Sequence, residues 1–275
     1  MSDAAPTPGQ AGALFHSGHL QDALAAASAA LKRAPTDLGA RILLAEMLAF
    51  SGNAERADVI LDAASDVDPT AAVAVAEFRQ LLRAEVARRQ LFRDGRVPEF
   101  IGEPSAWQRH ALAALVALRD GNAAEAARLS AEAESVRPAV RGRHGGQEFA
   151  DLRDADDLLA GTFEVLTTTG KYFWIPVERV QALLFHPPRR PRDLLWRRAT
   201  MSVASGPDGD VYIPAIYAAE PGVDDSLLLG RSTDWAGPEG GPVRGLGLRT
   251  FLVGEDAATV MELTEIEIEI AQEAG

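Results

Sequence analysis

One six-residue segment combines side chains that could do chemistry. Gly230-Arg231-Ser232-Thr233-Asp234-Trp235 brings together a cation, two hydroxyl groups, a carboxylate and an indole. Such groups occur in binding and catalytic sites, but Arg, Asp and Trp also meet at structural corners. We favour the structural interpretation, in which Asp234 fixes Arg231 or backbone amides and Trp235 covers a sheet. The alternative interpretation is an enzymatic function that uses this segment.

The other residues capable of chemistry are scattered along the chain. The chain has no cysteine, and its five histidines lack metal-ligand spacing: His16, His19, His110, His144 and His186. The sequence also lacks a phosphate-binding loop, a serine nucleophile elbow and a metalloprotease motif. We therefore expect no catalytic residue, no metal and no cofactor, and we interpret the protein as non-enzymatic.

The charge of the chain argues against nucleic acid as a partner. The formal net charge is −13, with −3 in residues 1–150 and −10 in residues 151–275. Such a molecule repels a polyanion. One local basic group is the exception, and we interpret it as a solvated or acid-paired face: Arg189, Arg190, Arg192, Arg197 and Arg198.

Membrane association is not predicted either. The chain contains no uninterrupted apolar run long enough to cross a bilayer, and its N-terminus does not have the pattern of a secretory signal. We expect a cytoplasmic protein.

A 34-residue repeat organises the N-terminal half. Five residues recur with this period: Leu14, Gly18, Ala23, Ala30 and Pro35 return as Leu48, Gly52, Ala57, Ala64 and Pro69. The period is that of the tetratricopeptide helix-turn-helix unit, in which small residues let two helices approach and a proline ends the second. We predict units over residues 4–37 and 38–71.

A third match follows after an interruption. Gly121, Ala126, Ala133 and Pro138 lie two periods plus one residue beyond their counterparts in the second unit. In between, residues 71–93 have helical spacing, whereas residues 95–105 contain two prolines and are irregular. We predict one long helix, an irregular segment, and a regular unit from Trp107 to about Arg137. An array of so few units is too short to form a free-standing solenoid, so we expect it to pack against the β-rich half of the chain.

The repeat also predicts a binding surface. The first helix of each unit lines the concave face of such an array, where a partner helix or extended peptide could bind. The candidate partner-binding residues are Phe15, Ile42, Glu46, Phe50, Leu115, Leu118 and Arg119. Glu46 and Arg119 would fix the direction of the partner. The alternative is that the apolar residues of this set only pack against neighbouring helices.

Beyond Gly145 the pattern changes to short apolar runs bounded by turns. We predict strands over residues 172–176, 183–186, 199–204, 211–214, 246–253 and 259–270, and a helix from Asp154 to Thr167. In the last strand, glutamates alternate with isoleucines, as in a sheet with one solvated face. The predicted fold is therefore α+β. It has a tetratricopeptide-like helical array over residues 1–144 and a mainly antiparallel β-rich domain over residues 145–275.

Ordered motifs are spread over nearly the whole chain. They include Pro35-x-Asp37-Leu38, Phe100-x-Gly102-Glu103-Pro104-x-x-Trp107, Ala155-Asp156-Asp157, Gly170-x-Tyr172-x-Trp174-Ile175-Pro176, Arg192-Asp193-Leu194-x-Trp196 and Gly230-Arg231-x-Thr233-Asp234-Trp235. Together they resemble the ImpE family, also called SciE or TagJ, of type VI secretion accessory proteins. We interpret the most distinctive motif residues as structural: Trp107, Tyr172, Trp174, Pro176, Trp196, Arg231, Asp234 and Trp235.

This resemblance implies a function in protein assembly. It implies an accessory factor that binds the N-terminal helix of the small contractile-sheath subunit and can be linked to a ClpV-type unfoldase that recycles the sheath. It transfers no catalytic residue and does not assign the helix-binding surface. A general peptide-binding adapter or chaperone outside secretion stays open as a second class of function.

Overall fold

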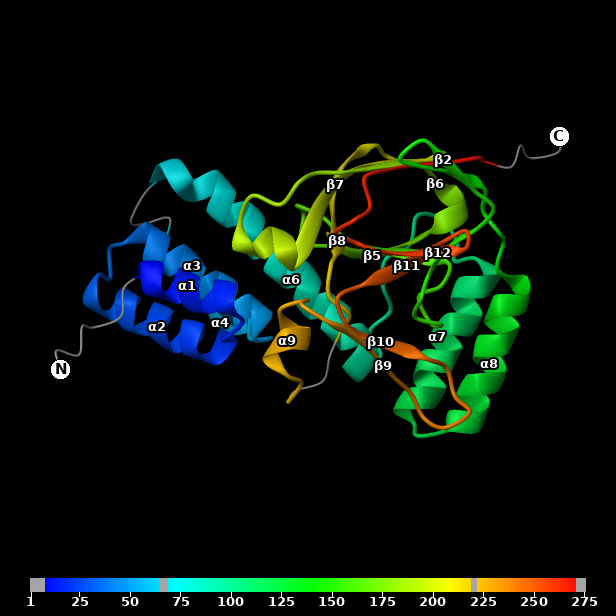
Figure 1. Ribbon diagram of the computed structural model, residues 1–275, viewed down its shortest axis with the longest axis horizontal. Coiled ribbons are helices and arrows are strands. Elements are labelled where there is room, and N and C mark those ends of the chain that lie inside the picture. The colour runs from blue at the N-terminus through cyan, green and yellow to red at the C-terminus, as the bar shows by residue number, and fades with distance from the viewer. Residues whose placement is uncertain (1–7, 65–68, 219–221, 271–275) are drawn as a thin grey trace.

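The N-terminal half of the protein is helical and the C-terminal half is rich in strands (Figure 1). The structure is a computed structural model and describes residues 8–64, 69–218 and 222–270. The helices are α1 (Pro8–Ser17), α2 (Leu20–Arg33), α3 (Leu38–Phe50), α4 (Ala54–Asp62), α6 (Ala72–Asp94), α7 (Ala106–Arg119) and α8 (Ala123–Val136). A short 3-10 turn, η1 (Pro69–Ala71), precedes α6.

Three helical hairpins confirm the predicted repeat units where the structure describes them; residues 4–7 and 65–68 of the first two units lie outside the described residues. Gly18, Gly52 and Gly121 turn the chain between the two helices of each pair, with φ angles of 92°, 84° and 75°. L-residues with a side chain rarely adopt this conformation, which explains why glycine recurs at the repeat period. Ala23 of α2 and Ala57 of α4 have no exposed surface. Because these side chains are small, the two helices of each pair can approach closely.

The interrupted unit has the structure that the sequence predicts. Residues 72–94 form the single 23-residue helix α6, which ends at Gly95 with a φ of 78°. No second helix follows within residues 95–105; the chain instead crosses to the edge of the β-sheet. There Glu99 donates its backbone N–H to the Tyr172 carbonyl (2.9 Å) and accepts from the Trp174 N–H (3.0 Å). A sheet edge thus stands where the partner helix of α6 would pack.

The C-terminal half is built of short antiparallel strands. They are β1 (Gly142–His144), β2 (Gln147–Phe149), β3 (Leu152–Asp154), β4 (Thr162–Leu166), β5 (Tyr172–Pro176), β6 (Val180–Phe185), β7 (Trp196–Val203), β8 (Gly209–Pro214), β9 (Thr233–Ala236), β10 (Arg244–Gly247), β11 (Thr250–Val253), β12 (Asp256–Thr259) and β13 (Glu265–Ile268). Three short helical turns connect them: η2 (Val177–Arg179), η3 (Pro191–Leu194) and α9 (Asp225–Leu228).

The strands form one large and two small sheets. The large sheet has the order β2-β1-β13-β6-β7-β8-β4-β5, a second sheet has the order β12-β11-β3, and β9 pairs with β10. In β13, Ile266 and Ile268 are buried while Glu265 and Glu267 are exposed, so the predicted alternation is confirmed. The mainly antiparallel architecture of this half is likewise as predicted.

Three details of the sequence prediction are wrong. Of the expected strand over residues 259–270, only Thr259, the last residue of β12, and β13 (Glu265–Ile268) are strand, with a turn between them. The expected helix from Asp154 to Thr167 is instead the end of β3, a turn and β4. Carboxylates shape that turn, because Asp154 accepts the N–H of Asp156 (2.8 Å) and Asp156 accepts the N–H of Leu158 (2.9 Å). The expected strand over residues 246–253 is broken into β10 and β11, which belong to different sheets.

The two halves share a hydrophobic core. One cluster of buried side chains contains residues of α1 to α8 together with Tyr172, Trp174, Trp196 and Tyr212 of the sheet. A second cluster fills the space between the large sheet and β12-β11-β3. Within the described residues, no helix combines the length and the apolar character that a membrane crossing requires.

Because the first cluster draws on both halves, we expect them to unfold together. Calorimetry should give one transition with equal calorimetric and van't Hoff enthalpies, coincident with the loss of helical circular dichroism. Two separated transitions, with the helical signal lost in the first, would show that the array folds independently of the strands.

Candidate partner-binding site

A buried ionic junction joins the central helix to the strands. Arg88 of α6 donates Nε to Glu164 of β4 (2.8 Å), and Arg249 donates Nη1 to the other oxygen of the same carboxylate (2.8 Å). Arg249 also donates Nε to Asp154 (2.5 Å). None of these four side chains exposes more than 3% of its surface. The four residues, which we call the ionic junction, therefore stabilise one another away from water.

Aromatic and backbone groups complete the contacts of the ionic junction. Tyr172 donates its hydroxyl to Glu164 (2.5 Å) and accepts the indole N–H of Trp174 (2.6 Å). Arg88 also donates Nη2 to the carbonyl of Ile216 (3.0 Å). One turn earlier on α6, Glu85 accepts the indole N–H of Trp196 (3.0 Å). These bonds fix the position of α6 against the strands.

The electrostatics of the junction favour an ionised Glu164. Burial by itself raises the pKa of this carboxyl, but the guanidinium groups of Arg88 and Arg249 outweigh burial and lower the pKa to about 2. Burial raises the pKa of Asp154, with Arg249 opposing it. Glu164 is therefore the carboxylate whose charge the junction stabilises most strongly.

A second buried ion pair covers the concave face of the array. Arg192 of η3 donates Nη1 to Glu46 of α3 (3.0 Å), and its guanidinium lies 4.7 Å from the centre of the Phe78 ring. Both charged side chains are buried. Burial raises the pKa of Glu46, and Arg192 lowers it in part. Glu46, a predicted partner contact, thus already holds a segment of its own chain.

The predicted partner-binding residues fall into two separate places. Phe15, Ile42, Glu46 and Phe50 lie on α1 and α3, where the rings of Phe15 and Phe50 are 5.1 Å apart. Leu115, Leu118 and Arg119 lie on α7, which stands beyond α6 at the other end of the molecule (Figure 1). Phe15, Phe50 and Leu115 are buried, whereas Ile42 and Leu118 are partly buried and Arg119 is exposed. The structure therefore does not bring the seven residues together.

A cleft of about 390 Å³ lies where the array meets the strands. Side chains of α6 form one wall, and residues around β8 and α9 form another. We call it the seam cleft, and its apolar lining includes Phe50, Phe92, Leu195, Ile216, Val223 and Leu228. Its polar lining comes mostly from α6: Glu85, Arg88, Arg89 and Arg93. Sequence reasoning found Phe50 but missed the strand-side wall, which has no repeat pattern.

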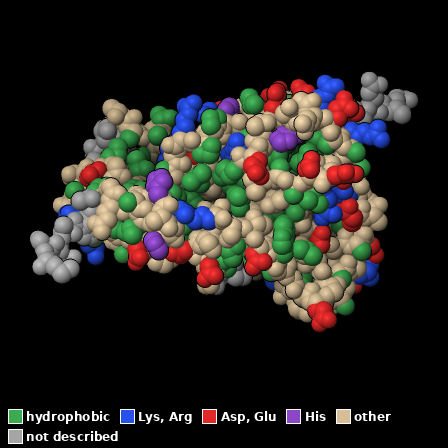
Figure 2. Space-filling view, viewed as in Figure 1, with side chains coloured by type: hydrophobic (Ala, Val, Ile, Leu, Met, Phe, Trp, Pro, Cys, Tyr) green, Lys and Arg blue, Asp and Glu red, His purple; other side chains and the backbone are tan. Residues whose placement is uncertain are grey.

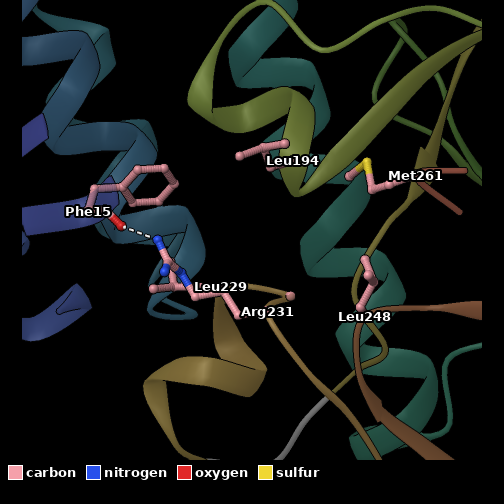
Figure 3. Close-up of a pocket in the computed structure, with 7 residues that line it drawn as sticks. Phe15, Leu194, Leu229, Arg231, Leu248 and Met261 are labelled. Carbon is pink, nitrogen blue, oxygen red and sulfur yellow. Dashed lines mark hydrogen bonds between the residues drawn. The ribbon is translucent and has the colours of Figure 1, made fainter. Parts of the chain in front are cut away.

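A smaller apolar pocket of about 200 Å³ lies beside Phe15 (Figure 3). Leu194, Leu229, Leu248 and Met261 line it from the strand side. Arg231 reaches across and donates Nη2 to the Phe15 carbonyl (3.1 Å) and to that of His16. This arginine therefore binds the last carbonyls of α1, where the helix dipole favours a cation.

The side chains of residues 231–235 diverge. Arg231 binds α1, and Asp234 accepts the backbone N–H of Trp235 (2.8 Å). Trp235 packs beside Tyr217, with 6.2 Å between ring centres, and keeps 44% of its surface exposed. The segment thus lacks the convergence that catalysis needs. The other motif residues, Trp107, Tyr172, Trp174, Pro176 and Trp196, are buried.

The described part of the chain shows no grouping of three or more histidine, aspartate or glutamate side chains that could hold a metal ion. The carboxylates of the ionic junction are instead saturated by arginines. What the geometry offers is a cleft with apolar walls and a polar rim, which suits the binding of a peptide or helix.

The architecture belongs to the class of tetratricopeptide-repeat proteins, with a β-rich C-terminal half added. A family model described as tetratricopeptide repeat matches residues 14–82, and one described as ImpE protein matches residues 146–267. The type VI secretion system accessory component TagJ of Pseudomonas aeruginosa is 33% identical over 258 residues, which cover 93% of this chain and 90% of TagJ. The chain belongs to the ImpE family, as its motifs predicted.

A solved structure has the same fold. The X-ray crystal structure of protein VPA1032 from Vibrio parahaemolyticus matches with a TM-score of 0.90 at 26% identity. The match covers 96% of this chain and 98% of that chain, so both halves and their arrangement are common to the two proteins.

Replacing the central carboxylate tests the ionic junction. Glu164→Gln leaves Arg88 and Arg249 without their shared anion, so the free energy of unfolding at pH 7 should fall by about 3–5 kcal/mol. The folded pKa is below the ordinary value of 4.5, so the contribution of this charge is present above pH 4.5 and is lost as the pH falls toward 2. Urea unfolding at several pH values should show the wild-type and variant stabilities converging with acid.

The exposed Glu103 provides the control. Glu103→Gln should change the stability by no more than about 0.5 kcal/mol at any pH. A difference between wild type and Glu164→Gln that stays constant from pH 7 to pH 3 would contradict the proposed charge state.

Proposed function

We propose that this protein is a non-enzymatic accessory component of a type VI secretion system. Its near full-length similarity to TagJ carries the proposal, and family membership supports an accessory role in secretion. More specifically, the protein binds the N-terminal helix of the small contractile-sheath subunit in the cytoplasm. Through that contact it presents the sheath subunit to a ClpV-type unfoldase.

The seam cleft is the site that we assign to the sheath helix. Its volume of about 390 Å³ is within the range of roughly 300–1,000 Å³ for binding pockets. That volume receives a few side chains rather than a whole helix, so the partner lies along the cleft and inserts its apolar stripe. Phe92, Val223 and Leu228 are only partly buried and can contact those side chains.

The charges at the cleft favour a defined orientation of the partner. Glu85 is buried, and Arg89 is 36% exposed and donates Nε to Glu85 (3.2 Å). Arg89 also donates to the carbonyl of Gly52, so it links α6 to the turn between α3 and α4. A partner carboxylate beside the apolar stripe would pair with the exposed part of this guanidinium.

The strength of such binding follows from the size of the cleft. Each large apolar side chain that the partner buries contributes roughly 1.5–3 kcal/mol before the cost of ordering. Two or three such side chains give a moderate affinity, which suits a complex that must release its sheath subunit. Leu115, Leu118 and Arg119 lie outside the cleft, and their role in binding stays a prediction.

A general peptide-binding adapter is the second candidate function. The tetratricopeptide match over residues 14–82 favours it, because arrays of this type bind many kinds of peptide. The two candidates differ in selectivity. An accessory protein of the sheath prefers the sheath helix to other amphipathic helices, and a general adapter does not.

Binding of a labelled sheath-helix peptide, measured by fluorescence anisotropy, tests the assignment. Val223→Asp places a charge in the apolar wall of the seam cleft and should raise the dissociation constant about tenfold, since one buried apolar contact is lost and a carboxylate is desolvated. Val59→Asp is the matched control, because Val59 is 70% exposed on α4 and outside the cleft.

The possible results distinguish an error in the assigned binding site from an error in the proposed function. Equal binding by wild type and a folded Val223→Asp variant would show that the cleft is not the site. Failure of the wild type to prefer the sheath peptide over an unrelated amphipathic helix would favour the general adapter.

A further inference from the structure

The five clustered arginines of the sequence are divided by the fold into two groups. Arg192 and Arg197 are buried, and each is bound inside the molecule: Arg192 by Glu46, and Arg197 by the carbonyls of His186 (3.3 Å) and Val260. Arg189, Arg190 and Arg198 instead line a separate pocket of about 410 Å³. This basic pocket is completed by His186, Pro187 and Asp193 and shares no residue with the seam cleft.

The acidic groups of the basic pocket are already engaged. Asp193 accepts the backbone N–H groups of Arg189 (2.9 Å) and Arg190 (3.0 Å), as well as Nε of Arg190 (3.2 Å). On the neighbouring strand, Asp210 accepts Nη2 of Arg198 (2.5 Å) and the hydroxyl of Thr200 (2.8 Å). Asp193, which is 9% exposed, therefore has little remaining capacity to accept hydrogen bonds, and each oxygen of Asp210 already accepts one.

Donors therefore exceed acceptors in the basic pocket. Each guanidinium carries five N–H donors. Arg198 uses one of them on Asp210, Arg190 binds Asp193 along one edge, and the exposed side chain of Arg189 has no partner among the described residues. Glu77, the next acid, accepts the hydroxyl of Tyr212. Arg190 also hydrogen-bonds the Tyr212 hydroxyl. The donors left for a ligand are therefore those of Arg189 and Arg198, and a planar oxyanion in the pocket that they line could accept two of them at once.

We propose that the basic pocket binds a carboxylate-bearing, acidic segment of a partner protein. The site is confined to one pocket in a molecule whose net charge is −13, so an extended polyanion would meet repulsion on either side of it. On the face in Figure 2, basic side chains form small separate groups among acidic ones. The pocket lining contains no aromatic ring other than that of His186 on which successive bases could stack. One or two carboxylates of a peptide fit this arrangement.

Titration with a fluorescein-labelled tetraglutamate peptide tests the proposal. Binding should be measurable at about 0.01 M salt and weaker at about 0.15 M, because the Debye length falls from about 30 Å to about 8 Å. Arg189→Gln should weaken binding by roughly two- to fivefold, as expected for the loss of one exposed ion pair. Arg56→Gln is the matched control, since Arg56 is also exposed and the substitution changes the net charge equally.

Three results would overturn the proposal. Equal weakening by Arg189→Gln and Arg56→Gln would mean that overall charge, rather than the pocket, attracts the peptide. Absence of peptide binding at low salt would show that the basic pocket does not bind acidic segments. Tighter competition by inorganic phosphate or single-stranded DNA than by unlabelled tetraglutamate would assign the pocket to a phosphate ligand. Each measurement is independent of sheath-helix binding, so its failure leaves the assignment of the seam cleft unchanged.

Discussion

The contact between Arg88 of α6 and Glu164 of β4 is the constraint on which the rest of the structure depends. An isolated charge at this depth would cost several kcal/mol, so each member of the ionic junction requires the others. The arginine is on the helix and the carboxylate is on the sheet, and the two can satisfy each other only in one position and rotation of α6. Closer to the N-terminus of α6, Arg79 pairs with Asp58 of α4 (2.6 Å). The same helix therefore also holds the helical array in place.

The fixed position of α6 explains the unusual form of the repeat array. In a regular array a second helix would cover α6, but here the strands occupy that side and the chain of residues 95–105 joins the sheet edge through Glu99. Arg192 then holds η3 over α3 through Glu46. The protein thus covers part of the concave face itself, and the seam cleft stays open where the two halves meet. A binding surface shared between the halves would make the β-rich half part of the recognition site.

The sequence predicted those features that depend on local spacing. The repeat units, the long helix and the alternation of β13 follow from periods of 34, 3.6 and 2 residues, and all are confirmed. The ionic junction was not predictable in this way, because its hydrogen-bonded partners are 76, 85 and 95 residues apart. Arg88 and Glu164 look like surface charges in a sequence. Glu46 was predicted as a partner contact for the same reason, since no local pattern shows that Arg192, 146 residues away, covers it.

The most direct test of the account is hydrogen–deuterium exchange of the full chain with and without the sheath-helix peptide. If the seam cleft is the recognition site, exchange should slow around Phe50, along residues 85–93 of α6 and around Val223 to Leu229, while α7 and α8 stay unchanged. Protection confined to α7 and α8, where Leu115, Leu118 and Arg119 lie, would contradict the central claim that the partner binds where the two halves meet.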